Sequence, residues 1–419
     1  MITRQQIHEL AEFDDQNAAG LSFFYQPATP RNKAHKEEAI LTKDLVREAQ
    51  RKLEGKEKPA GARADLDRIA RLWQELRERG MRSSGGHGKA VFACAGQGFW
   101  REYDLPAHEG GGTQLFVDRH FHMKPLVESM AEFPSLGVVL VDRRRARFFD
   151  LHLSELTERE GFFHPLSRRG RSDGFGGYDA GHAERRVEEE TREHFKFVAD
   201  FMKDALEKQM FANWILGCQE THWPQFEKHL HPYAAEKLLG RFSTGVKHMG
   251  REEICEQAGR IFREAGEKRC RETVQETIDQ ARHNARGVTG LRRVLHSLLS
   301  GEVQTLLVGN QYHAQAVECS GCGHLDAHLV SFCPICGRET RTVVDVGEAI
   351  LPWALRQDIE IIYVKDDAEF DKVGNIAALL RFRSQKGGSN VRSIADLPPN
   401  PSVSRPAGRV GRYRGLASG

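Results

Sequence analysis

Two Cys-x-x-Cys pairs in the last third of the chain constrain its fold more than any other feature. The pairs are Cys319–Cys322 and Cys333–Cys336; ten residues separate them, and a glycine follows each. Glycine permits the tight turn that points both thiolates of a pair at one ion. Four thiolates complete the tetrahedral shell of zinc and leave no position for water, so the sequence predicts a structural zinc site. An iron–sulfur or redox role is the alternative.

The other cysteines and the N-terminal residues indicate the cellular compartment of the protein and the redox state of its thiols. The remaining four of the eight cysteines occur singly along the 419 residues. No export signal is visible at the N-terminus. The longest apolar run has seven residues, whereas a membrane span needs about 20. We therefore expect a cytoplasmic protein with reduced thiols, in which paired cysteines bind metal rather than form disulfides.

Composition limits the kinds of partner. Lysine and arginine number 61 against 59 acidic residues, a formal net charge of +2. Any surface for RNA must therefore come from local clustering of charge. Hydrophobic residues make up 39 % of the chain, which is enough for true cores, and a chain this long is expected to form about two to four domains.

Strands that alternate with helices predict an α/β fold of three domains. The N-terminal domain is expected to contain helices over 36–55 and 62–80 and a strand over 89–94. The C-terminal α/β domain is expected to carry the cysteine pairs as a zinc-knuckle insertion. The predicted boundaries are 1–130 for the N-terminal domain, 131–270 for the central domain, 271–383 for the C-terminal domain and 384–419 for a disordered basic tail.

The central domain is predicted to begin with a hairpin and to continue into a long helix. Strands over 137–141 and 146–153 flank a turn at 142–144, and apolar residues recur at helical spacing from Ala183 to Leu206. Three consecutive arginines at the turn provide a cluster of positive charge. These candidate RNA-binding residues are Arg143, Arg144 and Arg145.

A basic, glycine-rich segment, residues 167–178, lies between the hairpin and the long helix. Arg168, Arg169 and Arg171 supply charge that attracts phosphate. Its glycines permit close approach of the backbone, and the following helix N-terminus favours an anion. We predict a mobile RNA-binding loop; the alternative is a surface loop with incidental arginines. The hairpin arginines would extend this basic surface if they face the same way.

Common catalytic motifs are absent from the sequence. It contains no Gly-x-Ser-x-Gly, no His-Glu-x-x-His and no dinucleotide-binding fingerprint. His120 and His122 would share a face if they lay on a strand, but no carboxylate follows at metal-binding spacing, so a structural role is favoured. Three further histidines near the cysteines are expected at the surface: His313, His324 and His328.

The order of these features resembles that of a known family. A hairpin, a basic glycine-rich loop, a long charged helix and a cysteine-bearing α/β domain follow one another in archaeal and eukaryotic class-one peptide release factors and in Pelota. The resemblance is closer to the bacterial archaeo-eukaryotic release factor family. It is carried by residues 136–142, 176–178 with the following helix, 301–308 and 374–382. The first domain is not covered, and no codon-reading motif is matched in it.

The resemblance implies a ribosome-binding translation factor. In release factors the central loop carries Gly-Gly-Gln and helps water attack the peptidyl-tRNA ester. Gly176 and Gly177 match the two glycines, but Tyr178 stands at the glutamine position. A phenol ring is larger than the glutamine amide and has a different donor geometry beside a developing oxyanion. The resemblance therefore implies a rescue, stress or hibernation factor that does not hydrolyse the ester, similar to Pelota or to the Pelota-like factor Balon.

Two other functions stay open at this point. One is a peptidyl-tRNA hydrolase or release factor that uses the Gly176-Gly177 loop, and the other is a nucleic-acid-binding protein unrelated to ribosomes. The partners implied by the resemblance are the ribosome with its RNA and a translational GTPase such as elongation factor Tu. The zinc site would rigidify the third domain.

Overall fold

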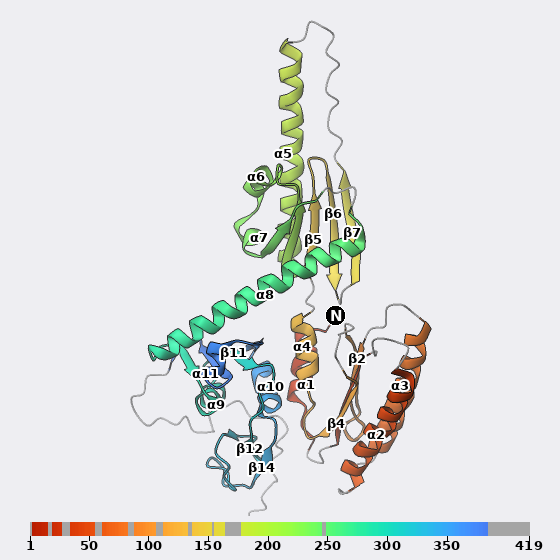
Figure 1. Ribbon diagram of the computed structural model, residues 1–419, viewed down its shortest axis with the longest axis vertical. Helices are drawn as coiled ribbons and strands as arrows, with labels where there is room; N and C mark the ends of the chain where they lie inside the picture. The colour runs from red at the N-terminus through yellow and green to blue at the C-terminus, as the bar shows by residue number, and fades with distance from the viewer. Residues whose placement is uncertain are drawn as a thin grey trace, which may run out of the picture. The chain divides into compact units, whose positions relative to one another are not determined.

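The computed structural model is shown in Figure 1. The chain divides into two units, Met1–Phe382 and Arg383–Gly419. Nearly all of the second unit, and with it the predicted tail at 384–419, lies outside the described residues. The structure describes residues 2–15, 19–26, 34–54, 61–82, 88–105, 112–132, 136–152, 155–163, 177–244 and 249–383.

Four sheets with flanking helices confirm the predicted mixed α/β architecture. The first sheet is antiparallel, with the order β3-β2-β1-β4. Its strands are β1 (Gly20–Tyr25), β2 (Gly88–Cys94), β3 (Phe99–Leu105) and β4 (Gln114–Asp118). Its helices are α1 (Arg4–Glu12), α2 (Ala34–Glu54), α3 (Ala62–Arg82), the short η1 (Ala95–Gln97) and α4 (Lys124–Glu132). The predicted helices are present as α2 and α3 and the predicted strand as β2, whereas β1, β3 and β4 were not predicted.

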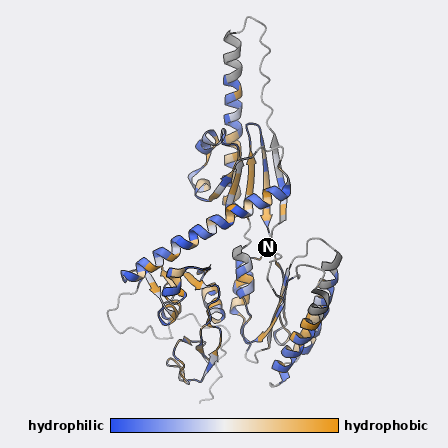
Figure 2. Ribbon diagram, viewed as in Figure 1, coloured by the Kyte–Doolittle hydropathy of each residue, from blue (hydrophilic) through white to orange (hydrophobic). Residues whose placement is uncertain are grey.

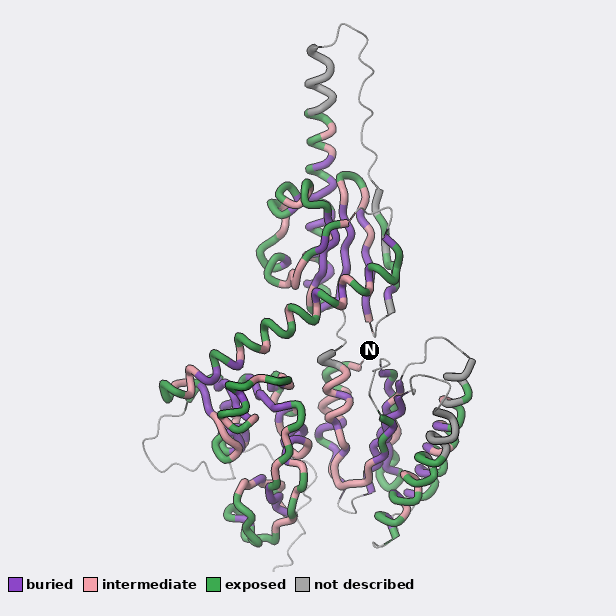
Figure 3. The backbone as a smooth tube through the Cα atoms, viewed as in Figure 1, coloured by how far each residue is buried: buried purple, intermediate pink, exposed green. Residues whose placement is uncertain are grey.

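Helices cover both faces of this first sheet because side chains alternate along its strands. Phe23 of β1 packs with Trp73 of α3, and Phe24 points to the other core, where Leu10 of α1 and Leu126 of α4 lie. All five side chains are buried. The inner strand β1 is buried along its whole length, whereas the outer strands β3 and β4 are partly exposed; Figure 3 colours the backbone by burial.

The central sheet mixes parallel and antiparallel pairs in the order β7-β6-β5-β8-β9. Strands β5, β8 and β9 run parallel, and β6 and β7 continue the sheet as antiparallel neighbours. The predicted hairpin is confirmed as β5 and β6; β7, β8 and β9 were not predicted. The elements are β5 (Leu136–Val141), β6 (Arg145–His152), β7 (Glu155–Phe163), α5 (Gly177–Glu207), β8 (Asn213–Cys218), α6 (Trp223–Phe226), η2 (Glu227–His229), α7 (Pro232–Glu236) and β9 (Leu238–Phe242).

Two long helices bury the two faces of the central sheet. Phe195 and Met202 of α5 pack against Val139 and Leu216 on one face. The second helix, α8 (Arg251–Arg282), places Ile254 in the core of the other face. Gly137 is required where β5 meets β8, because a Cβ atom there would lie 2.2 Å from the Trp214 ring.

Helix α5 is much longer than the strands it packs on. It has 31 residues, and β8 has six, so the helix extends about 46 Å against about 20 Å for the strand. Its packed part begins near Thr191, and the residues from 185 to 190 are exposed or only partly buried. Figure 1 shows the helix extending beyond the sheet. Among the residues with described side chains, the part of α5 that packs on the sheet is therefore its C-terminal part.

The third part combines a four-stranded sheet with a small three-stranded one. Their orders are β10-β16-β11-β15 and β13-β12-β14. Helix α8, whose surface is mostly hydrophilic (Figure 2), reaches this part with Val274 and Ile278. The elements are β10 (Gly287–Thr289), α9 (Leu291–Leu299), β11 (Val303–Gly309), β12 (Ala316–Cys319), β13 (Leu325–Asp326), β14 (Thr340–Val343), α10 (Val346–Arg356), β15 (Glu360–Val364), α11 (Ala368–Lys372) and β16 (Ile376–Leu380). Among the described residues no helix is long and apolar enough to span a bilayer.

Candidate metal centre and the adjoining ionic network

The four paired cysteines lie together at the end of the small sheet. Cys319 is the last residue of β12, and the thiol sulfurs of all four residues lie within 4.8 Å of one another. The Sγ atoms of Cys319 and Cys336 are 3.3 Å apart, and those of Cys322 and Cys333 are 3.6 Å apart. A disulfide needs about 2.05 Å, so these are four thiols around one point, as the sequence predicts.

Each pair forms a turn that depends on the glycine after it. Gly323 and Gly337 have φ values of +70° and +73°, a region that glycine enters without strain. The Gly323 N–H donates to the Cys319 carbonyl at 3.1 Å, and the Gly337 N–H donates to the Cys333 carbonyl at 2.9 Å. These hydrogen bonds close both turns around their thiols.

The donor set fits a tetrahedral ion. Zinc at about 2.3 Å from four sulfurs would hold them about 3.8 Å apart, close to the spacing found. Burial alone would raise the pKa of Cys319, but backbone N–H groups of Cys322 and Gly321 bring it down to about 6. The thiolate form that binds metal is thus favoured at Cys319, whereas burial and the neighbouring thiols raise the pKa of Cys322. The four cysteines could hold a metal, and four sulfurs would leave it no open position.

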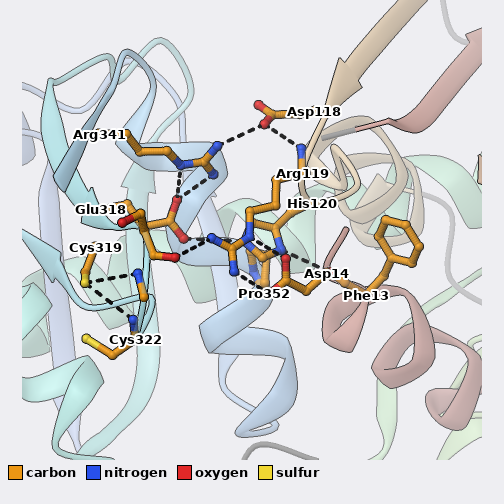
Figure 4. A network of polar contacts seen from close by, with 12 residues as sticks. Phe13, Asp14, Asp118, Arg119, His120, Glu318, Cys319, Cys322, Arg341 and Pro352 are labelled. Carbon is orange, nitrogen blue, oxygen red and sulfur yellow. Dashed lines mark hydrogen bonds and ion pairs between the residues drawn. The ribbon is translucent and has the colours of Figure 1, made fainter. Parts of the chain in front are cut away.

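A network of ion pairs lies directly beside the first cysteine turn (Figure 4). Arg119, which follows β4, bonds Asp14 through two nitrogens, one of them Nη2 at 2.6 Å from Oδ2. Its Nη1 also donates to the Ser320 carbonyl at 3.0 Å. Ser320 lies between Cys319 and Cys322, so the N-terminal part of the chain binds the backbone of the cysteine turn itself.

Glu318 is the centre of this network. Its side chain is 8 % exposed and accepts from Arg341 Nη2 at 2.6 Å, while His120 Nε2 lies 3.4 Å away. Burial would raise the pKa of Glu318, but the contacts with His120 and Arg341 hold it below its ordinary value. Burial would lower the pKa of His120, but Glu318 and the Phe13 carbonyl raise it above its ordinary value. Arg341 also reaches Asp118 at 3.4 Å.

A second carboxylate, Glu348 of α10, caps the helix α4. Its oxygens accept the backbone N–H groups of Met123 and Lys124, the latter at 3.3 Å from Oε2. Those N–H groups begin a helix and have no partner within it. Burial raises the pKa of Glu348. The cap joins parts of the chain that are more than 220 residues apart.

Apolar packing supports these polar contacts. Leu351 of α10 is buried in the same core as Leu10 and Phe13. At the rim of this contact, Arg4 Nε lies 2.6 Å from Asp358 Oδ1. We call the surface formed by these contacts and the Glu318 network the docking face. It binds the N-terminal part of the chain to the part that carries the cysteines.

The docking face was not predicted, although two of its histidines were singled out. His120 and His122 follow β4 in an irregular stretch rather than lying on a strand. His122 lies 3.7 Å from Asp118 and 3.8 Å from Glu348. The structural role favoured for these histidines agrees with these contacts. No sequence motif marks Glu318 or Glu348 as their partners, because each comes from about 200 residues away.

Comparison with known proteins bears on the central part of the chain. Residues 122–263 match bacterial archaeo-eukaryotic release factor family 10. A peptide chain release factor subunit 1 from Archaeoglobus fulgidus is 23 % identical over 303 residues, which cover 64 % of this chain and 71 % of that protein. The predicted resemblance to release factors is confirmed. The family match ends before the cysteine pairs and does not bear on the metal centre.

Solved structures of the release-factor and Pelota type are similar over more of the chain. The archaeal termination factor aRF1 is 16 % identical, over 91 % of this chain and 99 % of its own, with a TM-score of 0.24. Pelota from Archaeoglobus fulgidus is 12 % identical, over 91 % and 93 %, with a TM-score of 0.33. Dom34 from S. cerevisiae is 12 % identical, over 72 % and 81 %, with a TM-score of 0.39.

The release-factor loop itself is described only where it ends. Helix α5 begins at Gly177, so the backbone of Gly177 and Tyr178 is helical, whereas the sequence placed both at the end of a loop. Gly176 and the predicted RNA-binding residues Arg168, Arg169 and Arg171 lie outside the described residues.

The hairpin arginines are described. The β5–β6 turn holds Arg143 and Arg144 in exposed positions, and Arg145 begins β6. Arg145 is paired with Phe163, the last residue of β7. The turn and the end of β7 therefore lie at the same edge of the sheet. Whether these arginines form one basic surface with Arg168, Arg169 and Arg171 stays a prediction, because the latter three lie outside the described residues.

Proposed function

We propose that this protein is a ribosome-associated translation factor of the release-factor and Pelota type. It acts in ribosome rescue, stress or hibernation, in the cytoplasm, and does not hydrolyse peptidyl-tRNA. The observation that carries the proposal is the family match over residues 122–263, which spans the central sheet, all of α5 and the start of α8. The similar archaeal protein, named a peptide chain release factor subunit, supports the same class of activity.

Position 178 is the reason to propose binding without hydrolysis. Catalysis at the ester depends on groups placed within about half an ångström of a developing oxyanion and an attacking water. Tyr178 would crowd that space, and its ring could instead stack on an RNA base, a contact worth about 1–3 kcal/mol. Arg168, Arg169 and Arg171 would contact ribosomal RNA beside it, together with Arg143, Arg144 and Arg145.

Co-sedimentation with ribosomes followed by a peptide-release assay tests this proposal. The wild-type protein should pellet with ribosomes, less so as salt rises, and should release no peptide from ribosome-bound peptidyl-tRNA. Tyr178→Ala should weaken pelleting modestly and leave release absent. Absence of pelleting at low salt would contradict ribosome association.

A release factor or peptidyl-tRNA hydrolase is the second candidate. It is favoured by the Gly176-Gly177 pair and by the name of the similar archaeal protein. Peptide release by the wild-type protein, abolished by Gly177→Ala, would establish this candidate and overturn the non-hydrolytic proposal.

The metal and the partner are part of the same proposal. Zinc bound by the four thiolates would rigidify the C-terminal domain, in keeping with the closed sulfur shell. We further propose a translational GTPase such as elongation factor Tu as a partner on the ribosome. The domain boundaries near 130 and 270 stay predictions; proteolysis of the native protein would test them.

A further inference from the structure

The central sheet has one edge where several connections meet. Strands β5, β8 and β9 are parallel neighbours, so all three end at the same edge, which we call the carboxyl edge. The β5–β6 turn, the end of β7 and the β8–α6 connection lie there too. In sheets with parallel strands, ligands bind beyond the strand ends.

Cations at the carboxyl edge have few acidic partners. Arg143 and Arg144 are exposed, and their side chains make no hydrogen bond or ion pair with any residue that the structure describes. The nearby carboxylate of Asp142 is engaged by the backbone N–H groups of Arg144 and Arg145, at 3.0 and 2.8 Å. Asp142 therefore shapes the turn, and the two arginines extend from it toward solvent.

A flat cation lies at the same edge. The Arg241 guanidinium sits 5.0 Å from the centre of the Trp223 ring, and Glu220 Oε1 accepts from its Nη1 at 2.6 Å. The contact with the ring and the ion pair thus hold the guanidinium in place, and the side chain stays 34 % exposed. Burial lowers the pKa of the neighbouring His222, and the charge of Arg143 lowers it further, which ties the turn arginines to this group.

We propose that the carboxyl edge is a binding site for single-stranded RNA. Arg143 and Arg144 bind phosphates, and the guanidinium of Arg241, held between Trp223 and Glu220, stacks on a base. An acidic protein surface would be bound by the positive charges alone. A planar guanidinium held against an indole can in addition stack on a nucleobase, which favours RNA as the partner. This inference rests on the proposed ribosome association and names the RNA contact that belongs to the described sheet rather than to the loop.

Binding of a fluorescein-labelled single-stranded RNA of about twelve nucleotides, followed by anisotropy over a salt series, tests the site. Arg143→Ala with Arg144→Ala should weaken binding at least about tenfold and lower the salt slope by about 1.4, or about 0.7 for each lost phosphate contact. Arg241→Lys keeps the charge but loses the plane, so it should weaken binding about fivefold with an unchanged slope. Arg260→Ala with Arg271→Ala removes two exposed charges from α8 and is the matched control.

Pelleting of the same variants with ribosomes separates the outcomes. Equal RNA affinity of the wild type and the Arg143/Arg144 double variant would overturn the inference. So would loss of ribosome pelleting by the double variant with RNA affinity retained, because the edge would then bind a ribosomal protein. A wild-type protein that binds the RNA through this edge but never pellets with ribosomes would support the site and contradict the proposed function.

Discussion

The docking face and the carboxyl edge use the same kinds of side chain in opposite ways. At the docking face, Arg119 and Arg341 each hold a carboxylate within 2.6 Å, and both carboxylates are mostly buried. At the carboxyl edge, Arg143 and Arg144 face solvent, and among the described residues no acid pairs with them. Arginine content alone does not distinguish these two situations.

The two surfaces differ in whether the arginine charges are neutralised by carboxylates within the fold. A buried charge without a partner is costly, so a docking face made of such groups must pair them internally. An exposed arginine costs little and keeps its capacity for an external anion. The docking face is therefore a structural surface, and the carboxyl edge is free to bind a partner.

The largest expected effect is on the docking face and comes from the metal centre. Cys319→Ser should lose bound metal and lower the free energy of unfolding by roughly 5 kcal/mol, a part of the about 10–16 kcal/mol with which such sites bind zinc. Elemental analysis of protein purified without chelator and denaturant unfolding provide the measurement. The control is Cys255→Ser, at a lone cysteine of α8, which should leave the metal content unchanged. Native protein with no zinc and four freely titratable thiols would rule out the site.

A smaller loss is expected from removing the carboxylate that the network shares. Glu318→Ala leaves Arg341 and His120 without their buried partner and should cost about 2 kcal/mol, less than for a fully buried pair because Arg341 is 37 % exposed. Glu220→Ala at the carboxyl edge removes a carboxylate that is 63 % exposed and should cost at most about 1 kcal/mol. Urea unfolding of both variants measures the difference. Equal losses would contradict the contrast between the two surfaces.

The two surfaces should also respond to pH with opposite signs. Burial would lower the pKa of His120, but its contacts with Glu318 and with the Phe13 carbonyl raise it above its ordinary value. The contribution of His120 to the free energy of unfolding is therefore complete below about pH 6.5, and it is lost as the pH rises through the pKa of His120 in the folded protein. Burial and Arg143 lower the pKa of His222, so stability is lost there as pH falls below about 6.5.

Unfolding midpoints of His120→Gln and His222→Gln between about pH 5 and about pH 9 test this. The first substitution should flatten the alkaline side of the profile and the second the acidic side. The same change of slope in both variants would show that the charges around the two histidines do not differ as described.

The smallest effect on stability is expected at the turn arginines. Arg143→Ala with Arg144→Ala should change the free energy of unfolding by no more than about 0.5 kcal/mol, since exposed side chains without partners contribute little. Thermal unfolding, compared with the wild type, provides the measurement. A loss of about 2 kcal/mol would show that these arginines stabilise the fold and would contradict their assignment to binding alone.

Local patterns predicted the parts of the fold that depend on neighbours in sequence. The helix predicted over 62–80, the β5–β6 hairpin and the two cysteine turns each need only a short segment to specify them. Strands β1 and β8 were missed because a short apolar run does not reveal which strands it will pair with. The Glu318 and Glu348 contacts were missed for a stronger reason. They join residues about 200 positions apart, and no local spacing encodes them.

Helix α5 has a mechanical consequence for the residues at its start. From Gly177 to Glu190 the helix extends roughly 21 Å beyond the part that is packed on the sheet. A tilt of about 5° at the base would move the tip by about 2 Å, with no change inside the helix itself. The helix thus acts as a lever arm of fixed length. The position of the Tyr178 backbone therefore depends on how firmly Phe195 and Met202 pack against the sheet. A substitution that loosens this packing should widen the range of positions that the N-terminal end of α5 adopts.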